Sequence, residues 1–176
     1  IPSSKVTLRD GDILSIDTGA TVDGWVGDNA WTYPVGKVSE EKKKLLRVTE
    51  QCMWAGLDAA RAGNRLGDIG YAVQSIAEGE GYGVVRELVG HGIGREMHEE
   101  PNVPNYGHRH LGMKLEVGMV LAIEPMINCG TRNVRFMPDG WLVCTRDGKP
   151  SAHFEKTVAI TKEGPVVLTT EPDYRR

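Results

Sequence analysis

Two stretches of the chain repeat apolar residues at intervals of three and four, the spacing of one helix face. The first predicts a helix over residues 40–62, with Ser39 as its N-cap and Gly63-Asn64 at its end. The second predicts a helix over residues 67–78, which ends where glycines follow. The other apolar segments are too short for helices, so strands are expected at 84–89, 119–124, 141–145, 154–161 and 165–169.

Near the start of the chain, two strand-like stretches flank a hairpin signal. Residues 6–16, with a turn or bulge at Asp10-Gly11, and residues 25–33 lie on either side of Asp23-Gly24. A two-residue loop there sets Asp28 opposite Gly19, and Asp17 shares the face of Gly19. Asp17 and Asp28 are then diagonal neighbours, which would repel each other unless a cation lies between them. The alternative is that both face solvent on an edge hairpin.

The composition narrows the class of protein. The 176 residues include 21 basic and 24 acidic side chains, and a formal net charge of −3 argues against nucleic acid or an anionic membrane as partner. No apolar run approaches the ~20 residues of a membrane helix. Three widely spaced cysteines indicate a reducing, cytoplasmic compartment. One α+β domain fits best, and a start at Ile1-Pro2, without Met, is interpreted as a possible cut edge.

A glycine-rich run surrounds the first candidate histidine. In Gly90-His91-Gly92-Ile93-Gly94 the glycines allow close approach of the backbone, which suits a histidine in a crowded site. A structural histidine is the alternative. The run does not open a helix and is followed by glutamates, so it does not fit a dinucleotide loop. His98 lacks the second histidine of a zinc-protease motif.

Two glutamates occupy positions in which an acid is costly. Glu124 ends an apolar run before a proline, and Glu155 lies within a predicted strand core. Together with Asp17, Asp28 and His91 they offer four carboxylates and one ring nitrogen. Such an oxygen-rich set suits a pair of divalent ions such as Mn, Fe, Co or Zn, with carboxylates bridging them.

These residues fall in motifs that match one known family. The matching segments are Gly11-Asp12-Ile13-Leu14-Ser15-Ile16-Asp17, Gly27-Asp28, Gly90-His91-Gly92-Ile93-Gly94 with His98-Glu99-Glu100-Pro101, Ile123-Glu124-Pro125-Met126, Asp139-Gly140-Trp141 and His153-Phe154-Glu155. Residues 1–169 thereby resemble the type I methionine aminopeptidases, which have the pita-bread metallopeptidase fold, a curved antiparallel sheet with helices on its outer face. The short interval from Glu124 to Glu155 leaves no room for the helical insertion of the type II enzymes.

The resemblance implies a role for each site residue. Asp17 would bind one metal, His91 and Glu124 the other, and Asp28 and Glu155 would bridge both. A bridging hydroxide would attack the scissile carbonyl, with Glu124 as proton acceptor and donor.

Three further residues are implied in substrate binding. His98 would hydrogen-bond the substrate and steady the tetrahedral intermediate. Trp141 would wall the methionine pocket, with Met97 nearby, although Trp141 could equally be a core anchor.

The sequence also departs from the family. Asn29 stands where relatives usually have threonine, and it keeps a hydrogen-bonding side chain. Family members carry an upstream segment with part of the methionine pocket and a catalytic histidine. The resemblance therefore implies that residues 1–176 form the single catalytic domain in the C-terminal part of a longer metallopeptidase.

The expected activity is removal of the initiator methionine from nascent cytoplasmic proteins, near the ribosome, by a monomer unless a missing N-terminal piece is supplied as another chain. Neither direct nucleic acid binding nor membrane binding is expected. The alternatives are a proline-specific aminopeptidase or prolidase of the same fold, and a non-catalytic pita-bread binding module.

Overall fold

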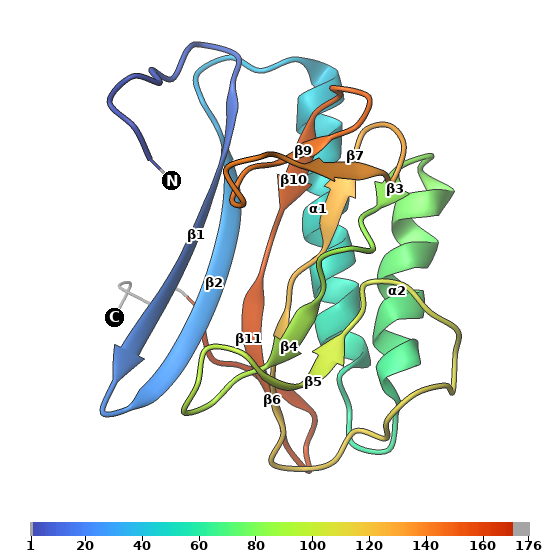
Figure 1. Ribbon diagram of the computed structural model, residues 1–176. Coiled ribbons are helices and arrows are strands. Elements are labelled where there is room, and N and C mark those ends of the chain that lie inside the picture. The colour runs from blue at the N-terminus through green and yellow to red at the C-terminus, as the bar shows by residue number, and fades with distance from the viewer. Residues whose placement is uncertain (1, 171–176) are drawn as a thin grey trace, which may run out of the picture.

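The computed structural model describes residues 2–170, arranged in layers (Figure 1). Two helices, α1 (Glu40–Ala59) and α2 (Leu66–Gly79), lie side by side along one face of the central strands. A long hairpin, β1 (Ile13–Val22) and β2 (Trp25–Pro34), stands over the opposite face. The space between this hairpin and the central strands is where the candidate residues gather.

Within residues 2–170 all strand pairs are antiparallel, and they form four sheets. The largest has the order β12-β11-β6-β4-β5, with bounds Pro165–Val167, Lys156–Ile160, Val120–Ile123, Gly90–Gly92 and Glu99–Val103. A three-stranded sheet has the order β10-β7-β3, with bounds Ser151–His153, Met126–Asn128 and Gly83–Val84. The β1–β2 hairpin and a short hairpin of β8 (Val134–Phe136) and β9 (Val143–Thr145) complete the set.

The turn of the long hairpin confirms the predicted register. Asp23 and Gly24 both have positive φ, 50° and 75°, as a two-residue turn between twisted strands requires. Gly19 pairs with Asp28, as expected from a two-residue loop. The strand expected over residues 6–16 is wrong in its first half, because a turn at Gly11, with φ of 93°, delays β1 until Ile13.

The helices confirm most of the expected bounds. Ser39 caps α1 and its side chain accepts a hydrogen bond from the Lys42 amide. The expected end near Gly63-Asn64 is wrong, since α1 stops at Ala59. The chain turns early because residues 63 and 64 are engaged elsewhere: the Gly63 amide donates to the Leu115 carbonyl, and the Leu115 amide donates to Asn64.

The strands expected at 119–124 and 154–161 are confirmed as β6 and β11, which are slightly shorter at their ends. The strand expected at 84–89 is wrong beyond its first residue, because the chain leaves one sheet there and crosses to the other. Residues 83–84 belong to the smaller sheet and the chain joins the larger one at residue 90. The same crossing separates β6 from β7 and β10 from β11. Residues 141–145 and 165–169 form strands only over Val143–Thr145 and Pro165–Val167.

The core lies between the helices and the two main sheets. The helices contribute fully buried side chains, among them Leu45, Cys52, Ile69 and Val73. Strands β6 and β11 contribute the side chains packed against them, among them Leu121, Ile123 and Val158. Over residues 2–170, neither helix combines the length and the hydrophobicity needed to cross a membrane. The helices thus serve as a rigid backing for the strands that carry the candidate site.

Helix α2 lies so close to a neighbouring loop that one position tolerates no side chain. A Cβ at Gly70 would collide with the backbone of Pro104 and Tyr106. We therefore expect Gly70→Ala to lower the free energy of unfolding by about 1–3 kcal/mol, the usual range for overpacking. Urea denaturation of the metal-free protein measures this effect.

Gly79→Ala is the matched control, because a Cβ at this position of the same helix meets nothing within 4 Å. It should leave the free energy of unfolding unchanged or raise it by up to about 1 kcal/mol. Equal losses in the two variants would contradict the close approach at Gly70.

Candidate metal centre

The long hairpin brings two aspartates to the inner side of the molecule. Asp17 pairs with Ala30, and Asp28 with Gly19, so the two carboxylates are diagonal neighbours on one face. Asp28 is buried, whereas Asp17 is exposed overall. Partial burial of its carboxyl raises the pKa of Asp17; Asp28 and Glu124 act in the same direction, and His153 opposes them. The alternative that both aspartates face solvent is therefore wrong for Asp28.

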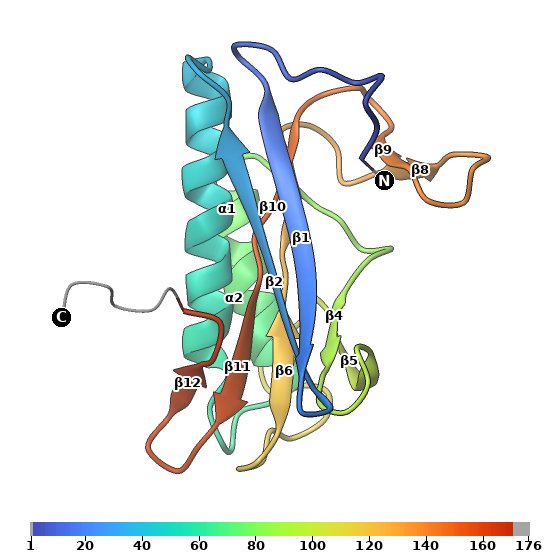
Figure 2. The same cartoon turned by 90° about the vertical axis from the view of Figure 1, so that its left-hand side faces the viewer.

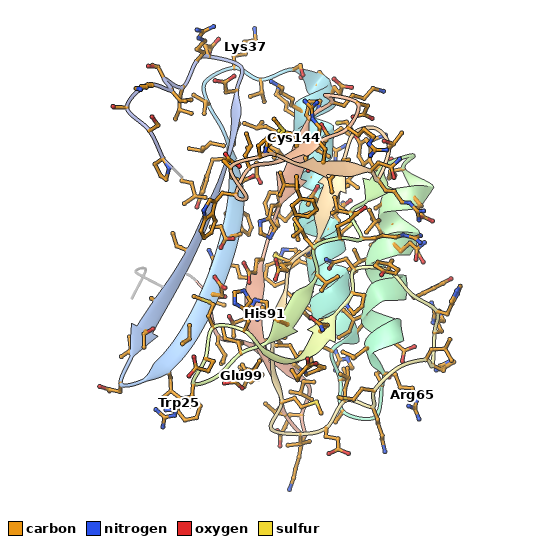
Figure 3. The ribbon with its side chains drawn as sticks, in the orientation of Figure 1. Trp25, Lys37, Arg65, His91, Glu99 and Cys144 are labelled. Carbon is orange, nitrogen blue, oxygen red and sulfur yellow. The ribbon has the colours of Figure 1, made fainter. Side chains whose placement is uncertain are left out.

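His91 lies on β4, a strand of the larger sheet, on the side that faces the hairpin (Figure 3). Its flanking glycines are needed for packing, since a Cβ at Gly90 would meet the Ala122 carbonyl and one at Gly92 the backbone of Glu100. Nδ1 lies 2.8 Å from the Gly92 carbonyl oxygen, so this nitrogen carries the proton and donates it. This hydrogen bond leaves Nε2 as the nitrogen that can offer a lone pair, the arrangement of a metal-binding histidine.

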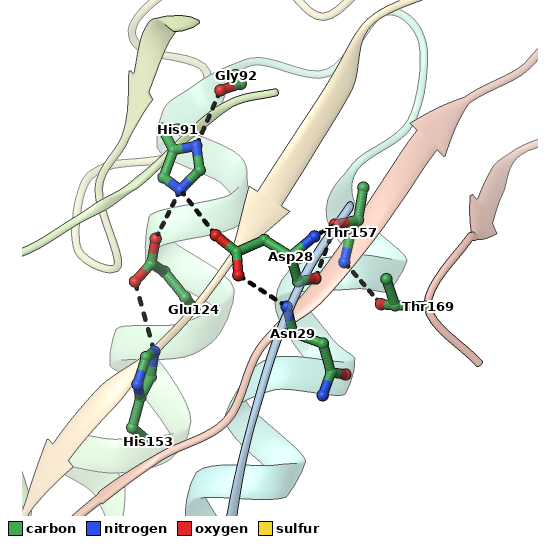
Figure 4. Close-up of polar contacts among 8 residues, drawn as sticks. All are labelled: Asp28, Asn29, His91, Gly92, Glu124, His153, Thr157 and Thr169. Carbon is green, nitrogen blue, oxygen red and sulfur yellow. Dashed lines mark hydrogen bonds and ion pairs between the residues drawn. The ribbon is translucent and has the colours of Figure 1, made fainter. Parts of the chain in front are cut away.

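The imidazole faces two of the carboxylates. His91 Nε2 lies 3.4 Å from Glu124 Oε1 and 3.9 Å from Asp28 Oδ2 (Figure 4). These contacts join residues from β2, β4 and the end of β6. A nitrogen lone pair aimed between two carboxylates is a ready-made set of ligands for a divalent cation.

Glu124 and Glu155 occupy equivalent places between the five-stranded and the three-stranded sheet. Glu124 follows β6 and precedes β7, and Glu155 lies between β10 and β11, so each stands where the chain crosses from one sheet to the other. Adjacent residues of β6 and β11 are paired, with Ile123 opposite Lys156. The two crossings therefore lie side by side, and the carboxylates of Glu124 and Glu155 lie close together.

Burial makes Glu155 the most perturbed acid of the site. Desolvation raises its pKa from 4.5 to about 9, and the nearby charges of Glu124, Asp28 and Asp17 act in the same direction. Its Oε1 is buried without a hydrogen-bond partner. A buried carboxyl with an unpartnered oxygen, surrounded by three further acids, is the environment that a bound cation would stabilise.

The structure adds His153, which belongs to the motif His153-Phe154-Glu155 but was not predicted as a site residue. His153 Nε2 lies 3.4 Å from Glu124 Oε2 and is buried without a hydrogen-bond partner. The signal was available, because residues 153 and 155 share a face when a strand alternates. Asn105, also missed, supports Glu124 by donating from Nδ2 to its backbone oxygen over 3.1 Å.

The side chains present fit a metal. The ligand atoms of Asp28, His91 and Glu155 all lie within 4.8 Å of one another, and so do those of Glu124, His153 and Glu155. Glu155 belongs to both groups, which is consistent with a shared ligand. Asp17 contributes a carboxylate beside the first group without being part of it.

The predicted substrate-binding residues lie at different distances from this centre. His98 is exposed, with its ring centroid 4.4 Å from that of His91. Met97 covers Gly19, where its methyl group would block any Cβ, close to Asp28. Trp141 is 75% exposed in the β8–β9 turn, which projects from the body (Figure 2), so the core-anchor alternative is wrong. The pocket role of Trp141 stays a prediction.

Comparison with known proteins identifies the family. The model of metallopeptidase family M24 matches residues 1–162. Methionine aminopeptidase 1 of Bacillus subtilis is 54% identical over 169 residues, which cover 96% of this chain and 68% of the relative. The chain belongs to metallopeptidase family M24. The resemblance to the methionine aminopeptidases is thereby confirmed, as is the expectation of a metallopeptidase hydrolase.

Solved structures of M24 enzymes confirm the fold. Methionine aminopeptidase from Thermotoga maritima superposes with a TM-score of 0.95 at 44% identity, over 97% of this chain and 69% of that one. Prolidase from Pyrococcus furiosus gives 0.76 at 26% identity, over 97% of this chain and 44% of that one. The fold is the α+β pita-bread fold. The chain spans about two thirds of the length of its methionine aminopeptidase relatives.

The raised pKa of Glu155 predicts how the metal-free protein responds to pH. Between pH 4.5 and about 9 the carboxyl is protonated when folded and ionised when unfolded. Unfolding then releases a proton, so the free energy of unfolding should fall as pH rises through this window and level off above it. Urea denaturation across the pH range measures the slope.

Glu155→Gln provides the control, since the neutral amide does not titrate and the slope should become shallower. An unchanged slope would contradict the assignment to Glu155. In the wild-type protein, binding of Mn²⁺ at neutral pH should release about one proton, measured by calorimetry in buffers of different ionisation enthalpy.

Proposed function

We propose that this protein removes the N-terminal methionine from polypeptides by metal-dependent hydrolysis of the first peptide bond. The observation that carries the proposal is the gathering of the predicted ligands from the hairpin, β4 and the two sheet crossings at one place. Similarity to methionine aminopeptidases over 96% of the chain supports this choice of substrate.

Two divalent ions, of Co, Mn, Fe or Zn, are the proposed cofactor. Asp17 would hold one ion, His91 and Glu124 would hold the other, and Asp28 and Glu155 would serve both. Such ions supply a nucleophile at neutral pH by lowering the pKa of water, and they polarise the peptide carbonyl. The protein contributes a fixed array of donors, with Glu155 giving up its proton when the site is filled.

Glu124 is placed to move the catalytic proton. Its two carboxylate oxygens face different histidines, His91 and His153, each over 3.4 Å. The side chain is thereby oriented from both sides, and Asn105 fixes its backbone. We assign to Glu124 the acceptance of a proton from the attacking water and its donation to the leaving amine.

The substrate lies on the side of His98 in this proposal. As the exposed neighbour of His91, His98 can donate a hydrogen bond to the substrate carbonyl without entering the buried centre. Met97, packed over Gly19, offers a thioether to the methionine side chain. Trp141 is proposed to wall the same pocket from the β8–β9 hairpin.

Neither alternative function, a proline-specific enzyme or a non-catalytic binding module, is favoured. A proline-specific enzyme would share the fold, yet identity to the prolidase of known structure is 26% against 54% to a methionine aminopeptidase. A non-catalytic binding module has no need of a buried glutamate with a pKa of about 9 among three other acids. Action on nascent cytoplasmic chains near the ribosome, by a monomer, is part of the proposal.

The proposal predicts release of free methionine from a Met-Gly peptide by the protein charged with Mn²⁺ or Co²⁺. Glu124→Gln should lower kcat by about 10²–10⁴-fold, because the amide cannot carry the proton. Glu116→Gln, the same change at an exposed position, is the control and should retain activity. Amino-acid analysis detects the product; hydrolysis of Xaa-Pro peptides without methionine release would favour the proline-specific alternative.

His98 should affect the reaction without affecting the metal. We expect His98→Ala to reduce kcat by about 10²–10³-fold, as loss of one donor to a developing oxyanion does. Its Mn²⁺ content should match that of the wild type, which atomic absorption can measure. The exposed His108→Ala serves as control. A loss of metal with unchanged kcat per bound ion would show that His98 only supports His91.

A further inference from the structure

The hairpin and the larger sheet meet where residues 28–30 of β2 lie beside residues 155–157 at the start of β11, and we call this contact the junction. These strands belong to different sheets. At one side of the junction the Glu155 amide donates to the Ala30 carbonyl over 2.8 Å. At the other, the Thr157 hydroxyl accepts from the Asp28 amide over 3.0 Å and donates to the Asp28 carbonyl over 2.8 Å.

Between these two contacts lies a pair of side chains, Asn29 and Lys156. The Lys156 ammonium donates to Asn29 Oδ1 and to the Thr169 carbonyl, each over 2.7 Å. It also lies 5.3 Å from the centre of the Trp31 ring. Lys156 is only 8% exposed, which is unusual for a lysine and requires partners of this kind.

Each member of this pair directly follows one of the two proposed bridging ligands. Asn29 follows Asp28, and its backbone amide donates to Asp28 Oδ1 over 3.0 Å. Lys156 follows Glu155 in the chain. The Asn29 side chain points away from the carboxylates (Figure 4), so the pair acts from the far side of the junction.

We propose that Asn29 and Lys156 form a cross-strand clamp that fixes the separation of Asp28 and Glu155 and thereby sets the affinity of the site for divalent metal. The clamp residues are positioning residues, because neither faces the ligand atoms. The inference rests on the metal ligation proposed above and goes beyond it by adding two residues outside the ligand set.

Physical reasons favour a role in metal affinity over simple anchoring. Asp28 lies on β2 and Glu155 directly precedes β11, and within residues 2–170 no ladder of backbone hydrogen bonds joins the sheets of these two strands. When both carboxyls are ionised, as metal binding requires, their mutual repulsion acts to push the hairpin away from β11. A buried ammonium bonded across the junction opposes that displacement, and it adds a positive charge behind the acids.

The test measures metal binding in Lys156→Met, Asn29→Ala and the double variant. Calorimetric titration of the purified protein with Mn²⁺ should show an affinity about 10- to 100-fold lower in each single variant, as for other residues that orient ligands. The double variant should lose no more than the worse single one, because both changes break one interaction. The absorption spectrum of the Co²⁺ form should shift in all three.

Two further variants complete the design. Lys162→Met removes an exposed lysine just beyond β11 and should bind Mn²⁺ as the wild type does. Lys156→Arg keeps the cation and should recover affinity relative to Lys156→Met. If Lys156→Met fails to fold, Asn29→Ala carries the test, since Asn29 is only half-buried.

The outcomes separate this inference from the proposed function. Wild-type Mn²⁺ affinity in both single variants, with only their melting temperatures lowered, would overturn the clamp and leave Lys156 as an anchor for Thr169. Methionine release is not measured here, so its absence would not affect the result. Failure of the wild-type protein to bind Mn²⁺ would overturn the metal-dependent function and the clamp with it.

Discussion

The structure depends on the repulsion among four carboxylates that the fold holds in a small space. Burial and the charges of Asp28 and Glu124 raise the pKa of both Asp17 and Glu155, and Glu155, the most buried, keeps its proton up to a pH of about 9. Folding into this arrangement is unfavourable without a cation, because charge is removed from water and set beside like charge. The rest of the molecule can be understood as the framework that withstands this repulsion.

In this framework the hairpin, the five-stranded sheet and the three-stranded sheet meet around the four carboxylates. The hairpin carries two aspartates, and the crossings between the two central sheets carry the two glutamates. A residue at a crossing does not pair with a neighbouring strand, so the direction of its side chain is not set by the alternation of a strand. Such a side chain can point toward a ligand. The helices take no part in ligation. They supply the rigid backing that keeps β6 and β11 in register.

Much of this arrangement could be predicted from the sequence because it rests on local rules. Asp23-Gly24 fixed a two-residue turn, the turn fixed the register, and the register placed Asp17 beside Asp28. Ser39 and the apolar spacing after it located the first helix. Glu124 and Glu155 could be singled out since acids in apolar strands need a reason to be there.

The errors arose where distant segments decide the outcome. The end of α1 depends on Leu115, far along the chain, and the strand expected at 84–89 is lost because the chain crosses there from one sheet to the other. His153 was not predicted as a site residue because its role depends on Glu124, which lies far away in the sequence between β6 and β7. Lys156, which looks like an ordinary strand lysine, is buried only because Asn29 and Thr169 meet it across the junction.

The proton retained by Glu155 changes the net charge of the metal-free protein. The formal net charge is −3 with every acid ionised, and one retained proton makes the metal-free protein slightly less acidic. Two divalent ions that displace this proton, together with the hydroxide they activate, would leave the loaded protein close to neutral. The filled form would then migrate more slowly in an electric field near neutral pH than the empty form, which stays negatively charged.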